Sequence, residues 1–125
     1  DAQFLGEYAF AYCARLRTVS LPYARFASAY LFNGCHSLES VAMPIATEVR
    51  TSSFASCRSL TEVSLPAVRH VGAFAFAFCA KLEAVSFPRL ESVHRNAFSG
   101  CRRLSNERMS VPEHVKNTLP DSFAL

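Results

Sequence analysis

Apolar residues recur along this chain with a constant period of 22 residues. Each period contains a phenylalanine, a cysteine three residues later and a leucine three residues after that, and it ends in the pattern Val-x-Leu-Pro. The positions that mark the register are Cys13, Cys35, Cys57, Cys79 and Cys101. Because the same apolar positions return in up to five copies, the pattern predicts a solenoid in which each coil covers its neighbour's apolar side chains.

The end of each coil predicts a short β-strand. The run Leu-x-x-Val-x-Leu alternates apolar and polar residues at its last positions, which is typical of a strand. The proline that follows ends this strand because it has no backbone N–H to donate. The stretch after the proline is too short for a regular helix, so we expect a turn, a short extended or 3₁₀ piece, and the return. The predicted fold class is an α/β solenoid dominated by short parallel strands, right-handed, with little or no regular helix.

Stacking of the coils also predicts the core. Equivalent residues of successive coils lie above one another, so the Phe, Cys and Leu positions form continuous apolar files. Burial of each large side chain contributes roughly 1.5–3 kcal/mol to stability. The central residues of these files, which we expect to form the structural core, are Phe32, Cys35, Leu38, Phe54, Cys57, Leu60, Phe76, Cys79 and Leu82.

The repeated unit Phe-x-x-Cys-x-x-Leu-x-x-Val-x-Leu-Pro resembles the BspA-like, or treponemal-type, leucine-rich repeat. The resemblance covers residues 1–104. It implies a surface or secreted location, an adhesive or protein-recognition role, no catalytic activity and no cofactor.

The two ends of the chain depart from the pattern. Asp1 follows directly after the place where a proline would stand, so the chain opens inside a repeat without a polar cap and without a leader sequence. We therefore expect a segment of a longer protein, with further repeats or domains, or another segment that covers this end. Residues 1–104 form five coils, and residues 105–125 are either a degenerate sixth half-repeat or a C-terminal cap or tail. Two extra residues restore the register there, because Met109-Ser-Val-Pro112 reads like Val63-Ser-Leu-Pro66.

Five thiols on one face raise the question of metal ligation or disulfides. A tetrahedral zinc site needs four ligands that converge on one point, and a straight file cannot converge. Neighbouring coils bring two Cα atoms near the distance of a disulfide. The odd number of cysteines and their identical surroundings favour buried free thiols that pack as small apolar side chains, without a metal.

The outward residues of the strand face are the first candidate binding surface, because repeat proteins use their concave sheet for recognition. They are small and hydroxylated, without the aromatic anchors of tight interfaces. The residues of this predicted concave surface are Thr18, Ser20, Ser40, Ala42, Glu62, Ser64, Ala84, Ser86, Asn106 and Arg108.

A second candidate is a basic edge, formed by the positions between the cysteine and the leucine of each coil. A solvated rim is the favoured interpretation. The alternative is a site for an acidic glycan or an acidic protein, whose binding would weaken with salt. The residues of this basic edge are Arg15, His36, Arg58, Lys81, Arg102 and Arg103.

Several other side chains share positions in neighbouring coils. Glu48 and His70 are predicted to form a surface ion pair rather than an acid–base dyad. Two further pairs of opposite charge, expected to support the register, are Arg17 with Glu39 and Arg69 with Glu91. Aromatic residues outside the Phe file are expected to pack over the return segment, with an exposed convex patch as the alternative; they are Tyr8, Tyr12, Tyr30, Phe74 and Phe78.

Composition narrows the function classes further. Half of the residues are hydrophobic and 18% are charged, which indicates a folded domain. The net charge is +3 and the pI is about 8.7, which is below the range typical of proteins that bind nucleic acid through a concentrated basic stripe. No apolar run is long enough to span a membrane. No catalytic or phosphate-binding motif occurs. The leading hypothesis is a non-enzymatic module for protein–protein or protein–glycan interaction in a surface or secreted, adhesin-like protein. The alternatives are a structural spacer or an intracellular scaffold.

Overall fold

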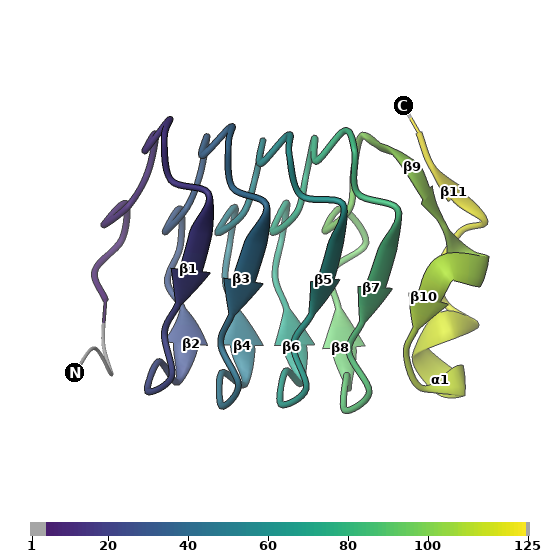
Figure 1. Ribbon diagram of the computed structural model, residues 1–125. Coiled ribbons are helices and arrows are strands. Elements are labelled where there is room, and N and C mark those ends of the chain that lie inside the picture. The colour runs from purple at the N-terminus through teal and green to yellow at the C-terminus, as the bar shows by residue number, and fades with distance from the viewer. Residues whose placement is uncertain (1–4, 125) are drawn as a thin grey trace.

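The computed structural model describes residues 5–124, so the prediction made about Asp1 lies outside the described residues. The chain forms a solenoid in which short strands of successive coils lie side by side (Figure 1). A front file of strands lies where the Val-x-Leu pattern predicts it, and its members are β1 (Thr18–Ser20), β3 (Ser40–Ala42), β5 (Glu62–Ser64) and β7 (Ala84–Ser86). These strands are parallel and the helical content is small, as the sequence predicts.

The front file is divided into two sheets. β1 pairs with β3, and β5 pairs with β7, each with equivalent residues of neighbouring coils in register. A third strand, β10 (Met109–Ser110), extends the second sheet beyond β7. Parallel pairing stops between β3 and β5, although both strands lie within the described residues.

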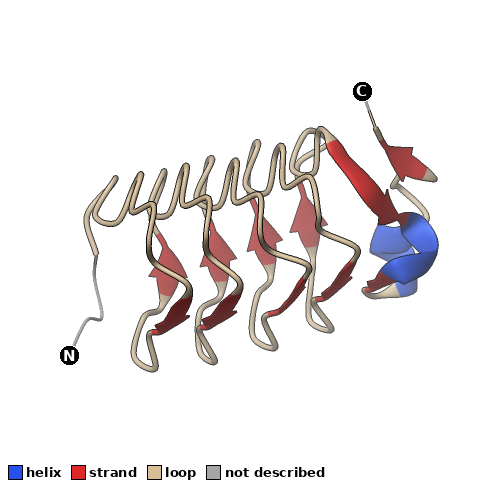
Figure 2. Ribbon diagram, turned by 45° about the horizontal axis from the view of Figure 1, so that its top comes forward, coloured by secondary structure: helices blue, strands red, loops and turns tan. Residues whose placement is uncertain are grey.

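A back file of strands lies on the opposite side of each coil (Figure 2). Its members form one continuous parallel sheet and are β2 (Phe26–Ala27), β4 (Glu48–Val49), β6 (His70–Val71) and β8 (Ser92–Val93). The short extended piece predicted after the proline is therefore confirmed. Its assembly into a second sheet was not predicted, because two-residue strands show no alternation in the sequence.

Tight turns close each coil on its third side. Phe32 N donates to Ser53 O at 2.7 Å, and Phe54 N donates to Ala75 O at the same distance, so these turns are also hydrogen-bonded between coils. The position two residues after each phenylalanine of the file has a positive φ, including Tyr12 at 61°. A side chain in this left-handed region costs roughly 1–2 kcal/mol, which the inter-coil hydrogen bonds offset.

The core runs through the centre of the solenoid. All nine residues predicted as structural core are fully buried. Phenylalanine rings of successive coils stack throughout the file, for example Phe32 on Phe54 with ring centroids 5.2 Å apart and Phe54 on Phe76 at 5.2 Å. Such contacts add roughly 0.5–1.5 kcal/mol per pair to the burial itself.

The C-terminal segment folds over the last coil (Figure 1). It consists of β9 (Cys101–Ser105), the 3₁₀ helix η1 (Asn106–Arg108), β10, α1 (Glu113–Lys116) and β11 (Ser122–Phe123). Met109 pairs in register with Val85, which is the alignment obtained by allowing two extra residues. β11 returns antiparallel to β9, an arrangement absent from the other described coils. The division of the chain at residue 104 stays a prediction.

The strand positions predicted for Asn106 and Arg108 are wrong. Both residues lie in η1, because the two extra residues form this turn before the chain rejoins the front sheet at Met109. The Asn106 side chain instead forms hydrogen bonds with the C-terminal segment. Its Nδ2 donates to the carbonyl oxygens of Lys116 at 3.1 Å and Leu119 at 3.3 Å.

Candidate functional site

A groove of about 720 Å³ runs across the front strands. β3, β5, β7 and β10 form its floor, and η1 together with Lys116 of α1 closes its C-terminal end. Of the predicted concave residues, those that line the groove are Ser40, Glu62, Ser64, Ala84, Ser86 and Arg108. Thr18, Ser20 and Ala42 lie on the same file of strands but outside the groove.

The charges of this groove are separated along its length. Glu39 and Glu62 stand over the strands, whereas Arg108 and Lys116 lie at the C-terminal end beside Glu107. Across residues 5–124, none of these five side chains is within 4.0 Å of an opposite charge. Their charges are therefore available to a ligand. Hydroxyl groups of serine and threonine between them provide hydrogen-bond donors and acceptors.

Sequence reasoning missed two charged residues at the C-terminal end of this groove. Glu107 and Lys116 come from a segment outside the 22-residue period, so no alignment of repeats places them beside Ser64 or Ser86. The two extra residues before Met109 were the available signal, because an insertion between stacked coils must project from the repeat.

The cysteine file has a role beyond packing. Each described thiol from the second coil onward donates to the phenylalanine carbonyl 25 residues earlier, as Cys57 Sγ does to Phe32 O at 3.3 Å and Cys101 Sγ to Phe76 O at 3.0 Å. Burial raises the pKa of the Cys57 and Cys79 thiols, so they remain protonated donors at neutral pH. The cysteines are free, and those from Cys35 to Cys101 are buried.

The back sheet brings together Glu48, His70 and Ser92, which are register partners on three neighbouring strands. His70 Nδ1 lies 2.7 Å from Ser92 Oγ, whereas Glu48 Oε1 lies 3.3 Å from Arg50 Nε. The ion pair predicted between Glu48 and His70 is therefore wrong, since Arg50 on the same strand edge holds the carboxylate. The serine, histidine and carboxylate do not form a connected relay, and all three are solvent-accessible.

Of the two other predicted cross-coil charge pairs, one is present in the structure. Arg69 Nε lies 3.5 Å from Glu91 Oε2, as predicted. Arg17 and Glu39, both within the described range, form no ion pair, so that prediction is wrong. Exposed pairs of this kind contribute at most about 1 kcal/mol.

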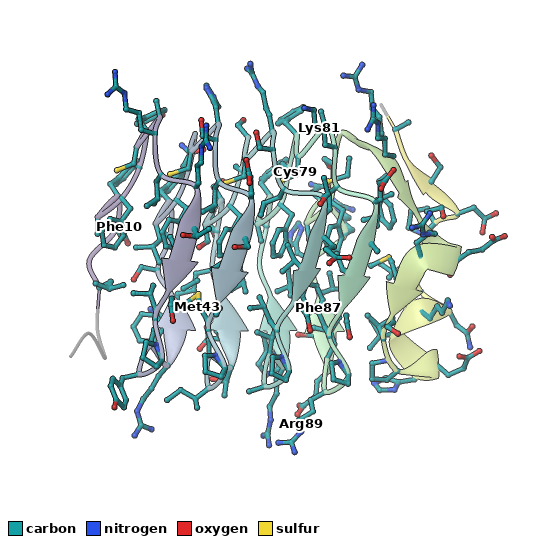
Figure 3. The ribbon with its side chains drawn as sticks, viewed as in Figure 1. Phe10, Met43, Cys79, Lys81, Phe87 and Arg89 are labelled. Carbon is teal, nitrogen blue, oxygen red and sulfur yellow. The ribbon has the colours of Figure 1, made fainter. Side chains whose placement is uncertain are left out.

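The basic edge is exposed along its whole length. Side chains tipped with nitrogen stand along the upper margin of the solenoid, Lys81 among them (Figure 3). The exposed members of this edge are Arg15, His36, Arg58, Lys81, Arg102 and Arg103.

The aromatic residues outside the core pack on neighbouring coils and also remain accessible. Tyr8 and Tyr30 stack with their ring centroids 4.6 Å apart and nearly parallel. Tyr12 lies against Gly34, and Phe78 lies against Gly100 in the same way. The expected packing is present, yet about half of the Phe78 side chain is exposed, so these rings also contribute to the surface.

Stacked coils with parallel strands and a 22-residue repeat define this chain as a leucine-rich-repeat solenoid. A family model described as the BspA type leucine-rich repeat region matches residues 1–105 in six copies. The chain belongs to this family. The leucine-rich repeat is in general a non-enzymatic fold for protein interaction.

Solved structures agree with this assignment. A leucine-rich repeat protein of T. pallidum is similar with a TM-score of 0.77 and 28% identity, over 81% of this chain and 49% of that chain. A leucine-rich repeat protein of Bacteroides ovatus is similar with a TM-score of 0.63 and 25% identity, over 81% of this chain and 33% of the other. The chain thus spans half or less of these relatives. No curated protein matches it. Among residues 5–124, no helix has the length and apolarity needed to cross a bilayer.

Proposed function

We propose that this chain is a non-enzymatic protein-binding module, and that the front groove binds an extended segment of a partner protein that carries basic residues. The observation that carries the proposal is the pair of free carboxylates, Glu39 and Glu62, over a hydroxyl-lined floor. Glu62 lies on β5, which pairs in register with β7, so the backbone beneath this carboxylate is already ordered before a ligand binds.

The basic residues at the C-terminal end of the groove favour one orientation of the bound segment. Arg108 and Lys116 would repel a cation at the C-terminal end and would accept an acidic side chain or a chain terminus there. A segment with lysine or arginine over β3 and β5 and a carboxylate near η1 therefore matches the charges along the groove.

The test uses the whole chain and a pair of peptides, one rich in lysine with a free C-terminus and one in which glutamine replaces each lysine. We expect only the lysine peptide to shift the amide resonances of β3, β5, β7 and β10. Glu62→Lys should weaken this binding by about ten-fold or more, because it replaces attraction with repulsion in the groove. Glu7→Lys makes the same change of charge at an exposed residue outside the groove and should leave binding intact. Equal loss in both variants would contradict the proposal.

A structural spacer is the second candidate. It is favoured by the small side chains of the floor, Ser40, Ser64 and Ser86, which offer no aromatic anchor. Persistent absence of ligand binding by the full-length parent protein, together with an unchanged solenoid, would support this alternative.

The resemblance to the family also leads us to propose that the parent protein is surface-displayed or secreted and acts in adhesion. Protease treatment of intact source cells, followed by detection with an antibody against this chain, tests the location. Loss of the signal, or its presence in the medium, is expected, whereas full protection would favour the intracellular scaffold.

A further inference from the structure

Within the basic edge, alanine stands directly after the cysteine at Ala80, as it does at Ala14 in the first coil. The position directly after the cysteine holds Arg58, Ala80 and Arg102 in three successive coils. Because neighbouring strands of a sheet lie about 4.8 Å apart, the two arginines start about 10 Å from each other with only a methyl group between them. The space is a notch of about 450 Å³, lined by these three residues together with Phe78 and Gly100.

An aromatic ring forms one side of this notch. The ring of Phe78 lies so close to Gly100 that a Cβ atom there would come within 2.6 Å of ring atom Cδ1. Gly100 itself has a φ of +78°, which disfavours any larger residue. The ring therefore packs against a glycine backbone, while Phe78 as a whole residue remains 50% exposed beside the two arginines.

The two arginines are available for a ligand. Within residues 5–124 neither Arg58 nor Arg102 is paired with a carboxylate, and Lys81 and Arg103 add positive charge along the same edge. A guanidinium group binds a carboxylate through two parallel hydrogen bonds. Aromatic and arginine side chains placed together are also the composition typical of binding hot spots.

We propose that this notch binds an acidic segment of a partner protein, with a carboxylate between Arg58 and Arg102 and the adjoining apolar side chain against Phe78. The remaining lining supports a peptide rather than an acidic glycan. Ala80 and Gly100 are apolar, and no side chain of the notch can accept the hydroxyl hydrogens of a sugar. The notch is distinct in its lining residues and opposite in charge to the front groove, so it extends the proposed function to a second surface.

The chain provides its own matched control. Tyr12 lies against Gly34 as Phe78 lies against Gly100, and the residue is 67% exposed. In these two coils Ala14 stands in the place of Ala80 and His36 in the place of Arg102, and residues 5–124 include no counterpart of Arg58, so this site has the ring without the pair of guanidinium groups.

The experiment measures binding of the whole chain, at low ionic strength, to a fluorescent peptide in which leucine adjoins two glutamates. We expect Arg58→Gln, Arg102→Gln and Phe78→Ala each to weaken binding about ten-fold, while Tyr12→Ala leaves it unchanged. The peptide with glutamine in place of glutamate should not bind. Circular dichroism and thermal unfolding of each variant verify that the solenoid is retained.

A decisive variant is Ala80→Arg. Histidine or arginine occupies the same position in other coils, so the substitution is compatible with the fold. It adds a positive charge but fills the notch. We expect it to weaken peptide binding, whereas diffuse attraction to a basic edge would make binding stronger and would overturn the proposal.

Binding of a heparin fragment with the same dependence on Phe78 and Ala80 would overturn the choice of a peptide. Retained peptide binding in Glu62→Lys separates this site from the front groove.

Discussion

The thiol of Cys79 donates a hydrogen bond to the carbonyl oxygen of Phe54 across a distance of 3.1 Å. The same oxygen accepts the backbone N–H of Cys57 from its own coil at 3.3 Å. Each cysteine therefore connects two coils through one carbonyl group, and the contact repeats along the solenoid. A cysteine is suited to this position because it is small enough for the crowded interior and still has a hydrogen to donate.

Replacing Cys79 by alanine removes this donor and leaves a small cavity. We expect the free energy of unfolding to fall by about 1–3 kcal/mol. Urea unfolding followed by circular dichroism measures the change. Cys13→Ala, at a half-buried cysteine of the first described coil, should have a smaller effect. Equal effects at the two positions would contradict the importance of the buried hydrogen bond.

The buried thiols should also make stability depend on pH. Burial raises the pKa of Cys57 in the folded protein, whereas the unfolded chain loses this proton near the ordinary thiol value of about 8.5. Above that pH the unfolded state binds fewer protons than the folded state, so the free energy of unfolding falls as pH rises. The stabilising contribution of the Cys57 thiol is complete at a pH below its pKa in the unfolded chain. It is lost as the pH rises towards the pKa of this thiol in the folded protein.

Urea midpoints measured between about pH 8 and about pH 10 test this prediction. The decline should be less steep in Cys57→Ala than in the parent chain, because one of the responsible groups is absent. Parallel declines would show that other groups, such as the lysines, account for the pH dependence.

Truncation of the leucine file should be most damaging in the middle of the solenoid. Leu60 is fully buried, and Leu60→Ala is expected to lower the free energy of unfolding by about 2–5 kcal/mol. Leu16 is only partly buried, so Leu16→Ala should lower it less. Denaturant unfolding of both variants provides the comparison.

Gly100→Ala should destabilise the chain by about 1–3 kcal/mol, because alanine is strained at a positive φ and its Cβ meets the ring of Phe78. Gly6→Ala is the matched control, since a Cβ there meets no atom within 4 Å. In a double-mutant cycle, Phe78→Ala should recover the part of the loss that comes from the ring. Thermal unfolding of the single and double variants measures this coupling.

Periodicity was sufficient to predict the interior from the sequence. Phe54 and Leu60 return at fixed intervals, and residues at equal intervals in stacked coils must share one file. It was not sufficient for the back sheet, since strands as short as His70–Val71 carry no pattern of their own. The binding surfaces depend on exceptions to the repeat. Lys116 reaches the front groove from a segment outside the period, and the notch exists because Ala80 interrupts a row of larger side chains.

The break in pairing between β3 and β5 has a mechanical consequence. The back sheet continues across the same two coils through β4 and β6, and the hydrogen bond from Phe32 N to Ser53 O joins their turns, so these coils lack a ladder only at the front. Since the front groove crosses this break, a ligand bound there lies over the one junction between described front strands that no parallel ladder spans, where the back sheet and the turns set the spacing of the coils.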